Sequence, residues 1–396
     1  MTGSRTDRDP TALGRFTGPV IGIVLVGANL RAALTGVGPL LPAIEQDTGL
    51  SSASAGLLVA LPLLMFAAVS TMVVHTIRRG PALVVRIALA VLIVGVLIRS
   101  TPGVIFLFVG TAILAAALGF GNVLLPAMVR GVVPEGRVGV VTGGYVTAMS
   151  LAAAVSSGIA APMAEHLPGG WRTALAGWAV LAIAALLVWS ATERRMVMAP
   201  VATDRAPTPW RSPLAWQVSV FMGLQSLGFY ATLAWLPSVM HDHGISPSAA
   251  GIYLFFFQIL GLVAINALPQ LSRRLGGYRC LAVIASVLDA LGFALLACAP
   301  QFALVSIALL GPGAGICLVL AMTFQTERAQ DAPQAAALAG MAQTVGFTLA
   351  AVGPLVLGLL HSRTARWEPA LITLAAVTIV QAAVGVGAGR DTHVGA

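Results

Sequence analysis

Long runs of apolar residues alternate with short polar breaks along almost the whole chain. A bilayer core of about 30 Å needs about 20 apolar residues when the segment is helical. Runs of that length occur in twelve places, at residues 16–43, 53–76, 81–98, 103–129, 138–163, 171–191, 214–239, 248–271, 278–299, 301–325, 335–360 and 367–388. The pattern therefore predicts an all-α membrane protein with twelve transmembrane helices.

The longest polar break lies in the middle of the chain, between Thr192 and Ser212. It is rich in charged residues and proline, which is typical of a solvated linker, and it leaves six runs on either side. The organisation that follows is a cytoplasmic tail at 1–15, a six-helix half at 16–191, a cytoplasmic linker at 192–212, a second six-helix half at 213–389 and a cytoplasmic tail at 390–396.

A short internal repeat supports this division. Residues 49–56 read Gly-Leu-Ser-Ser-Ala-Ser-Ala-Gly, and residues 244–251 read Gly-Ile-Ser-Pro-Ser-Ala-Ala-Gly, at an offset of 195 residues. The same offset aligns Pro42 with Pro237. Parallel repeats of six spans, related by an axis along the membrane normal, are a transporter architecture with the substrate site between the halves near the bilayer midplane.

Composition and charge agree with a membrane protein. Only 9% of the residues are charged and 58% are hydrophobic, whereas soluble domains carry about 25% charged residues. The chain contains no lysine, so its net charge of +8 comes from arginine. Most arginines fall in breaks on one predicted side, which the positive-inside rule makes cytoplasmic, and no nucleic-acid partner is needed to explain them. The arginines on the other side are Arg99, Arg172, Arg363 and Arg366.

This distribution predicts a multi-pass protein of the inner cell membrane with both termini in the cytoplasm. No secretory leader is predicted, because the apolar run after Arg15 is far longer than an h-region of about 7–15 residues. The three cysteines, Cys280, Cys298 and Cys317, lack the paired spacing of metal ligands or of a disulfide framework. We therefore predict no metal site and no cofactor.

Arg31 lies near the middle of the first apolar run, and no other ionisable residue occurs from Phe16 to Ile44. A guanidinium stays protonated at any accessible pH, and placing it at bilayer depth costs about 2.5–3.5 kcal/mol on insertion scales. It must therefore face a partner, a cavity or an anion. Hydrogen bonding to helix carbonyls is the structural alternative, while snorkelling is disfavoured so far from either end of the run. We predict that Arg31 contacts an anionic substrate and that Thr35, one turn further, shares its face.

Several motifs carry a resemblance to a known family. They are Asn29-Leu30-Arg31 with Leu-Thr-Gly-Val-Gly-Pro-Leu-Leu-Pro at 34–42, Gly-Asn-Val-Leu-Leu-Pro at 121–126, Gly-Leu-Gln-Ser-Leu-Gly-Phe-Tyr at 223–230 with Trp-Leu-Pro at 235–237, and Met-Ala-Gln-Thr-Val-Gly at 341–346. The chain resembles the major facilitator superfamily, and within it the cyanate and nitroimidazole transporter branch. The usual loop motif between the second and third spans is degenerate here, because residues 75–80 lack its aspartate.

Polar side chains inside other spans complete the predicted site. The resemblance implies that most of the spans one, four, seven, eight and eleven line a central cavity. The amides in these spans are Asn29, Asn122, Gln225, Gln258 and Gln343. Each amide alone could equally hold helices together through hydrogen bonds, but together they would surround Arg31 with neutral donors. Tyr145 and Met149, which share a helical face, and Tyr230 are predicted to line the same site.

Asp289 is the one acidic residue well inside an apolar run. An intramembrane carboxylate is by default a proton-relay candidate, so Asp289 is a candidate for proton coupling, but we favour a structural or cavity-facing role. The resemblance implies that its span, the ninth, is a peripheral support helix. Gly311-Pro312-Gly313 should loosen the tenth span and act as a hinge. Glu45 and Asp47 are predicted to be solvated rim residues.

The sequence thus predicts a monomeric secondary transporter with the major facilitator fold. Its substrate would be a small anion or a small planar polar solute, cyanate-like or nitroimidazole-like as the resemblance implies, with protons as a further candidate partner. The alternative is a proton-coupled multidrug or metabolite exporter of the same fold, which needs a titrating carboxylate in the cavity. An enzyme is disfavoured because the histidines fall at span ends, and no phosphate-binding Gly-x-x-x-x-Gly-Lys string supports nucleotide-driven transport.

Overall fold

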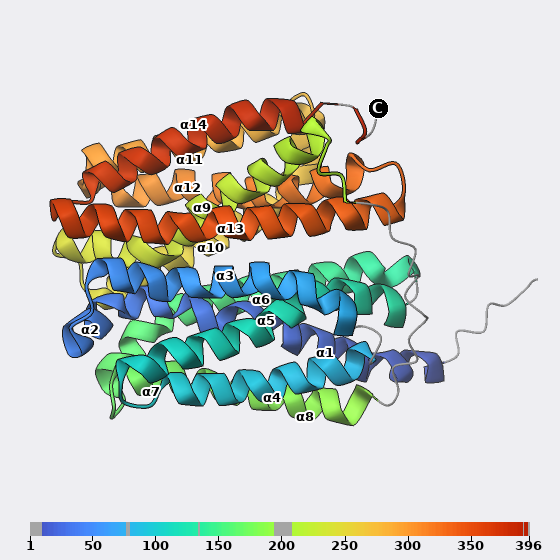
Figure 1. The fold of residues 1–396 in the computed structure, drawn as a ribbon, viewed down its shortest axis with the longest axis horizontal. Coiled ribbons are helices and arrows are strands. Elements are labelled where there is room, and N and C mark those ends of the chain that lie inside the picture. The colour runs from blue at the N-terminus through green and yellow to red at the C-terminus, as the bar shows by residue number, and fades with distance from the viewer. Residues whose placement is uncertain (1–9, 77–79, 134, 194–207, 391, 395–396) are drawn as a thin grey trace, which may run out of the picture.

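The structure is a computed structural model that describes residues 10–76, 80–133, 135–193, 208–390 and 392–394. This part of the chain is helical throughout, without strands, and its helices form two stacked groups (Figure 1). Twelve helices among the described residues are long and apolar enough to cross a membrane, which confirms the predicted fold class. Residues 194–207 of the predicted linker 192–212 and residues 77–79 of the loop at 75–80 lie outside the described residues.

The first group contains α1 to α8 and the second contains α9 to α14 (Figure 1). The first comprises α1 (Pro10–Thr35), α2 (Val37–Thr48), α3 (Ser52–Thr76), α4 (Pro81–Arg99), α5 (Val104–Val132), α6 (Glu135–His166), α7 (Trp171–Ala176) and α8 (Trp178–Thr192). The second comprises α9 (Pro213–Asp242), α10 (Pro247–Arg274), α11 (Tyr278–Cys298), the short 3₁₀ helix η3 (Pro300–Phe302), α12 (Ala303–Glu327), α13 (Ala332–Thr364) and α14 (Glu368–Ala388).

Local chemistry explains where these helices begin and end. Proline occupies the first or second position of α4, α9, α10, α13 and α14, where its missing N–H costs no hydrogen bond. Ser246 caps α10 by accepting a hydrogen bond from the Ala249 amide, and Asp331 caps α13 by accepting one from the Gln334 amide. Gly49 ends α2 in the left-handed conformation, with φ of 69°.

The first membrane span is broken between α1 and α2 at Gly36. Pro39 has no N–H to donate to the Thr35 carbonyl, which instead accepts a hydrogen bond from Ser157 Oγ at 3.2 Å. Two more side chains reach the end of α1: Ser156 Oγ donates to the Ala32 carbonyl at 2.7 Å, and Arg99 Nη1 donates to the Ala33 carbonyl at 2.8 Å. Neighbouring helices thus stabilise the break, which the prediction of one segment at 16–43 did not include.

The two groups meet mainly through three helix pairs among the described residues, which are α3 with α13, α6 with α10, and α2 with α9. Glycines allow close backbone approach at these contacts: a Cβ on Gly56 would lie 2.6 Å from the Pro354 carbonyl oxygen, and a Cβ on Gly251 would lie 2.6 Å from that of Ser157. We call the end of the bundle that holds the α2–α3 connection the distal end, and the opposite end, where α1 begins and the chain finishes, the terminal end (Figure 1).

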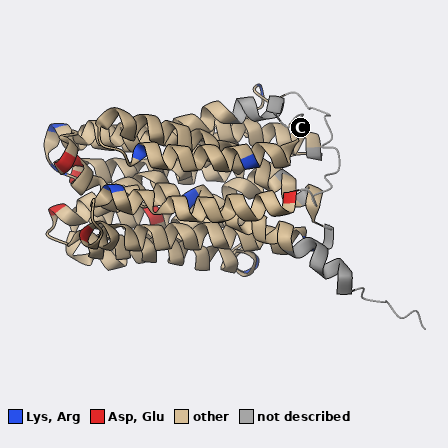
Figure 2. Ribbon diagram, turned by 90° about the horizontal axis from the view of Figure 1, so that it is seen from below, with Lys and Arg blue, Asp and Glu red and all other residues tan. Residues whose placement is uncertain are grey.

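The halves are packed together at the distal end, where Gly56 approaches Pro354 and Gly358 approaches Ser52 across the interface, so the central space is closed on this side. Nearer the terminal end, a Cβ on Gly143 or Gly144 of α6, or on Gly340 of α13, would meet no atom within 4 Å. The described Asp and Glu residues gather mostly at the distal end, and most of the bundle between the two ends carries no charge (Figure 2).

Candidate functional site

Arg31 is the central charged residue of the candidate site. It lies on α1 just over one turn before the break at Gly36 and is half-buried. Its guanidinium carbon lies 5.3 Å from the centre of the Phe229 ring and 5.1 Å from that of the Tyr230 ring, both on α9 in the other half. Its buried Nη1 has no hydrogen-bond partner, and among the described residues no carboxylate forms an ion pair with it.

Arg31 borders two cavities. The first lies between α1, α2, α3, α5 and α9, and is bordered by Thr35, Thr111, Tyr230 and also Arg99. The second lies between α1, α6, α9, α10 and α12. The predicted residues Arg31, Thr35 and Tyr230 therefore meet at the first cavity, and the second brings Arg31 together with Met149 and Gln258.

A chain of hydrogen bonds links the two halves beside Arg31. Gln258 Nε2 on α10 donates to Ser157 Oγ on α6 at 3.0 Å, and Ser157 Oγ donates to the Thr35 carbonyl at 3.2 Å. Thr35 Oγ1 in turn lies 3.2 Å from the Arg31 carbonyl and 3.0 Å from that of Ala153. Gln258 therefore connects the second half to the broken part of the first span.

Aromatic rings form an apolar wall of the site. The Phe229 ring lies 5.4 Å from the Tyr230 ring, nearly perpendicular to it, and 5.8 Å from the Phe257 ring of α10. A guanidinium over ring faces interacts with the aromatic quadrupole. The site thus combines one fixed positive charge with aromatic surfaces suited to planar solutes.

Three predicted site residues take part in contacts away from these cavities. Asn29 is 2% exposed, and its Nδ2 donates to the Leu25 carbonyl at 2.9 Å and to the Leu181 carbonyl of α8 at 3.3 Å. Asn122 Nδ2 donates to the Leu118 carbonyl of its own helix at 3.2 Å. Tyr145 is buried. A Cβ added at Gly27 of α1 would lie 3.0 Å from the Cβ of Tyr145, so Tyr145 lies where α6 packs closely on α1.

The other two predicted amides also lie outside the cavity walls given by the described residues. Gln225 is buried in α9, where its Nε2 donates to Ser226 Oγ at 2.6 Å and its Oε1 has no partner. Gln343 is half-buried on α13. A contact of these residues with substrate stays a prediction.

Helix α12 lies between Asp289 and the second cavity. Its side chain is 5% exposed, its Oδ1 has no partner, and it lies beside Gly313 of α12. Gly311 and Gly315 of the same helix border the cavity and pack against α10 at Gly261. The Gly-Pro-Gly segment is thus pressed between Asp289 on one side and α10 on the other, and α12 runs unbroken through it.

The sequence reasoning missed Arg99. It treated Arg99 as an arginine outside the membrane core, whereas its side chain is 1% exposed and borders the same cavity as Arg31. An arginine at the end of an apolar helix, after twelve uncharged residues, is typical of a solvated flank, so no signal in the sequence separated this residue from the others.

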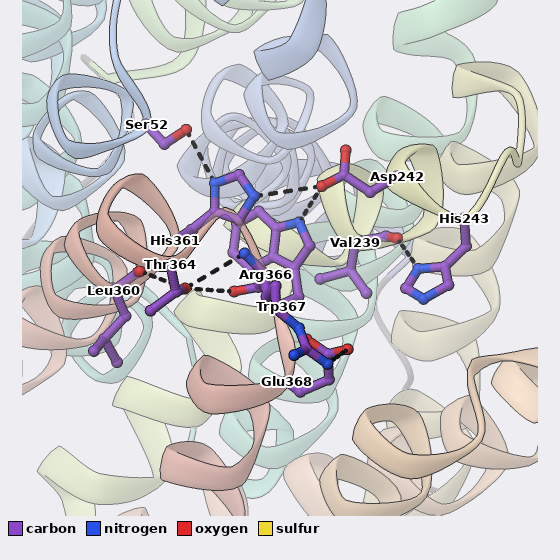
Figure 3. A network of polar contacts seen from close by, with 10 residues as sticks. All are labelled: Ser52, Val239, Asp242, His243, Leu360, His361, Thr364, Arg366, Trp367 and Glu368. Carbon is purple, nitrogen blue, oxygen red and sulfur yellow. Dashed lines mark hydrogen bonds and ion pairs between the residues drawn. The ribbon is translucent and has the colours of Figure 1, made fainter.

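A polar network joins the halves at the distal end (Figure 3). His361 of α13 lies between them, because its Nδ1 is 3.3 Å from Ser52 Oγ of α3 and its Nε2 is 3.4 Å from Asp242 Oδ2 of α9. The imidazole also stacks on Trp367 at 4.0 Å, and the Trp367 indole donates to Asp242 at 2.8 Å. Nearby, Asp47 is exposed as predicted, whereas Glu45 is half-buried.

Two halves of six membrane helices with cavities at a central arginine define a membrane transporter fold. The chain belongs to the Major Facilitator Superfamily, whose sequence profile matches residues 20–354. It is 36% identical to the uncharacterized transporter YycB of Bacillus subtilis over 379 residues, which cover 95% of this chain and 94% of the relative.

Two relatives from Escherichia coli have named solutes. The 2-nitroimidazole transporter is 36% identical over 380 residues, covering 95% of this chain and 96% of the relative. The cyanate transport protein CynX is 29% identical over 351 residues, covering 86% and 89%. Among solved structures, a bacterial homologue of the human lysosomal transporter Spinster in an inward-facing, occupied conformation matches with a TM-score of 0.79 at 14% identity, covering 94% of this chain and 96% of that one. These comparisons confirm the predicted family and fold.

Proposed function

We propose that the protein is a secondary active transporter that carries a small anion or a small planar polar solute, cyanate-like or nitroimidazole-like, across the inner membrane by alternating access. The observation that carries this proposal is the position of Arg31 between two cavities, with a buried, unpartnered Nη1 and no carboxylate paired with it among the described residues. The names of two relatives point to the same solutes.

The chemistry of Arg31 suits such a solute. A guanidinium cannot be deprotonated in a protein, so the site keeps its positive charge at every working pH. In surroundings of low dielectric constant, that charge attracts an anion far more strongly than it would in water. The rings of Phe229 and Tyr230 beside it would hold a planar, polarisable solute by stacking while the guanidinium donates to its oxygen or nitrogen atoms.

The arrangement of the halves supports access from one side at a time. They are packed together at the distal end, and glycines of α6 and α13 nearer the terminal end have no atom close to them. If the termini are cytoplasmic, as the arginine distribution predicts, Arg31 is reached from the cytoplasm in this conformation. The break at Gly36 and the Gly-Pro-Gly segment of α12 are the candidate hinges through which the halves rock. Uptake and export would use the same cycle.

The alternative, a proton-coupled multidrug or metabolite exporter, needs a titrating carboxylate that faces the substrate. Asp289 lies behind α12, and Glu45 lies at the distal rim. Neither borders the two cavities at Arg31 within the described part of the chain, and this favours the anion proposal.

The test is ligand-dependent thermal stability of the detergent-purified protein with cyanate, nitrate and 2-nitroimidazole. A ligand at 100 times its dissociation constant adds about 2.7 kcal/mol to the native state. We expect at least one of these solutes to stabilise the wild type and Arg31→Lys more strongly than Arg31→Gln. Arg366→Gln, which removes an exposed arginine paired with Glu368, is the matched control and should behave as the wild type. Equal stabilisation of all variants by neutral apolar compounds alone would contradict the proposal and support the exporter.

A further inference from the structure

Arg99 is a second buried arginine on the cavity that Arg31 borders. It is the last residue of α4, is 1% exposed, and forms no ion pair with any described carboxylate. We infer that Arg99 forms a second anion site, distal to Arg31 in the same cavity, which takes a small monovalent anion. The inference rests on the proposed function, because it adds a second binding position to the same anion path.

The hydrogen bonds of Arg99 leave one edge of its guanidinium free. Nη1 donates to the Ala33 carbonyl at 2.8 Å, whereas Nε and Nη2 are buried and have no partner. Nε and Nη2 together form the side-on fork of a guanidinium, the edge that binds two oxygens of a carboxylate or nitrate bidentately. The group that Arg99 could bind through this edge is therefore an anion with one or two terminal acceptor atoms.

A purely structural role explains only part of this geometry. The bond to the Ala33 carbonyl satisfies an acceptor near the end of α1, next to the break at Gly36, and a cation is favourable at a helix C-terminus. That role uses one nitrogen. Burying the remaining donors without partners is costly, and a buried charge without a counter-ion costs more, so the free edge requires a partner.

The cavity connects the two arginines. Its walls between them come from α3, through Leu58, Val59 and Pro62, and from α5, through Thr111. Arg99 lies toward the distal end, which is closed in this conformation, whereas Arg31 faces the aromatic pair of α9. An anion that leaves Arg31 toward the distal end would meet Arg99 next, so the two sites would hold successive positions along one path.

The number of bound anions can be measured from thermal stability. Once a ligand exceeds its dissociation constants, stabilisation rises linearly with the logarithm of its concentration, and each bound ligand adds an equal slope. The melting temperature is measured against cyanate and, separately, nitrate at constant ionic strength in gluconate. We expect the slope of the wild type to be twice that of Arg99→Gln and twice that of Arg31→Gln. Arg366→Gln, which alters only an exposed arginine, should keep the wild-type slope.

Val59→Phe keeps the test decisive if Arg99→Gln does not fold. This change narrows the cavity between the arginines and leaves the bond from Arg99 to Ala33 in place. We expect it to halve the slope as well. If Val59→Phe and any folded Arg99→Gln protein keep the wild-type slope, Arg99 is a helix cap and the inference is wrong.

The outcomes also separate this inference from the proposed function. A wild-type slope for one anion, lost in Arg31→Gln and kept in Arg99→Gln, overturns the second site and leaves the central one intact. A slope that is lost in Arg99→Gln and unchanged in Arg31→Gln supports the second site while it overturns the role of Arg31. A wild type that neither anion stabilises overturns both.

Discussion

Asp47 and Asp242, 195 residues apart, accept the same hydrogen bond in the two halves of the molecule. The Trp171 indole donates to Asp47 Oδ2 at 3.2 Å, and the Trp367 indole donates to Asp242 Oδ2 at 2.8 Å. Each tryptophan precedes or begins the last membrane span of its half. The sequence repeat at the same offset thus extends to a repeated contact at the distal end.

The two halves differ in what surrounds this contact. Asp47 pairs with Arg172 at 2.7 Å, a cation within its own half. Asp242 instead faces His361, whose other ring nitrogen reaches Ser52 across the interface. Among the described residues, only the second copy of the contact therefore links the halves, through the His361 imidazole.

Replacing His361 with alanine should weaken the closed distal end. The change removes the contact with Ser52 and the stacking on Trp367, and it leaves the packing of α3 on α13 otherwise intact. We expect a larger population of molecules that are open at the distal end. Spin labels at Ser54 and Ser362, on a background without the exposed cysteines, would report this as a longer distance in electron paramagnetic resonance.

The control for this prediction is Arg366→Gln. Arg366 pairs with Glu368 at 3.0 Å within the second half and forms no hydrogen bond or ion pair with the described residues of the first half, so its loss should leave the distance distribution unchanged. If His361→Ala also leaves the distribution unchanged, the distal network does not contribute to closure.

Gly251 should be intolerant of a larger side chain in this conformation. A Cβ there would lie 2.6 Å from the Ser157 carbonyl oxygen, a backbone atom that cannot swing aside. We expect Gly251→Val to lower the free energy of unfolding by about 1–3 kcal/mol through overpacking. Gly143→Val is the matched control on α6, because its Cβ would meet no atom within 4 Å. Equal melting temperatures for the two variants would show that the helices part at little cost.

The ends of the membrane helices could be predicted from the sequence. The runs at 81–98 and 278–299 become helices at Pro81–Arg99 and Tyr278–Cys298, because proline and glycine mark where the chain leaves the helix. The break at Gly36 could not be predicted in this way. Pro62 lies inside a helix that stays unbroken, so a proline alone does not dictate a break.

What distinguishes the first span is its surroundings. Ser156 and Arg99 donate hydrogen bonds to the carbonyls of Ala32 and Ala33 beside the break. Both lie far from the first span in the sequence, so the sequence of that span does not predict these bonds. The residues that line the candidate site could not be predicted from the local sequence either. Gln225 and Gln258 occur in neighbouring spans, yet only Gln258 borders a cavity at Arg31 among the described residues. Because these helices are apolar on every side, hydrophobicity does not encode which face turns inward.

The hydrogen bond from Gln258 to Ser157 should couple the two halves measurably. Interhelical hydrogen bonds in membranes contribute about 0.6 kcal/mol on average and up to about 1.7 kcal/mol. A double-mutant cycle with Gln258→Leu and Ser157→Ala, read from denaturation in mixed micelles, should give a coupling energy within this range. Thr348→Ala, which removes an exposed hydroxyl bonded within α13, is a control that should show no coupling to Gln258. A coupling energy of zero would mean that the bond does not persist in the membrane protein.

Asp289→Asn should leave substrate transport and its dependence on a proton gradient unchanged. Asparagine has nearly the shape of aspartate, so the packing beside Gly313 is kept, and the carboxyl lies behind α12 rather than on the cavity. Asp289→Leu should destabilise the protein, because a branched side chain has no room against the α12 backbone. Uptake into proteoliposomes with and without an imposed pH gradient measures the first effect, and the melting temperature measures the second. If Asp289→Asn abolishes gradient-driven accumulation while exchange of labelled solute continues, Asp289 is the proton site. That result would favour the proton-coupled exporter over the anion transporter.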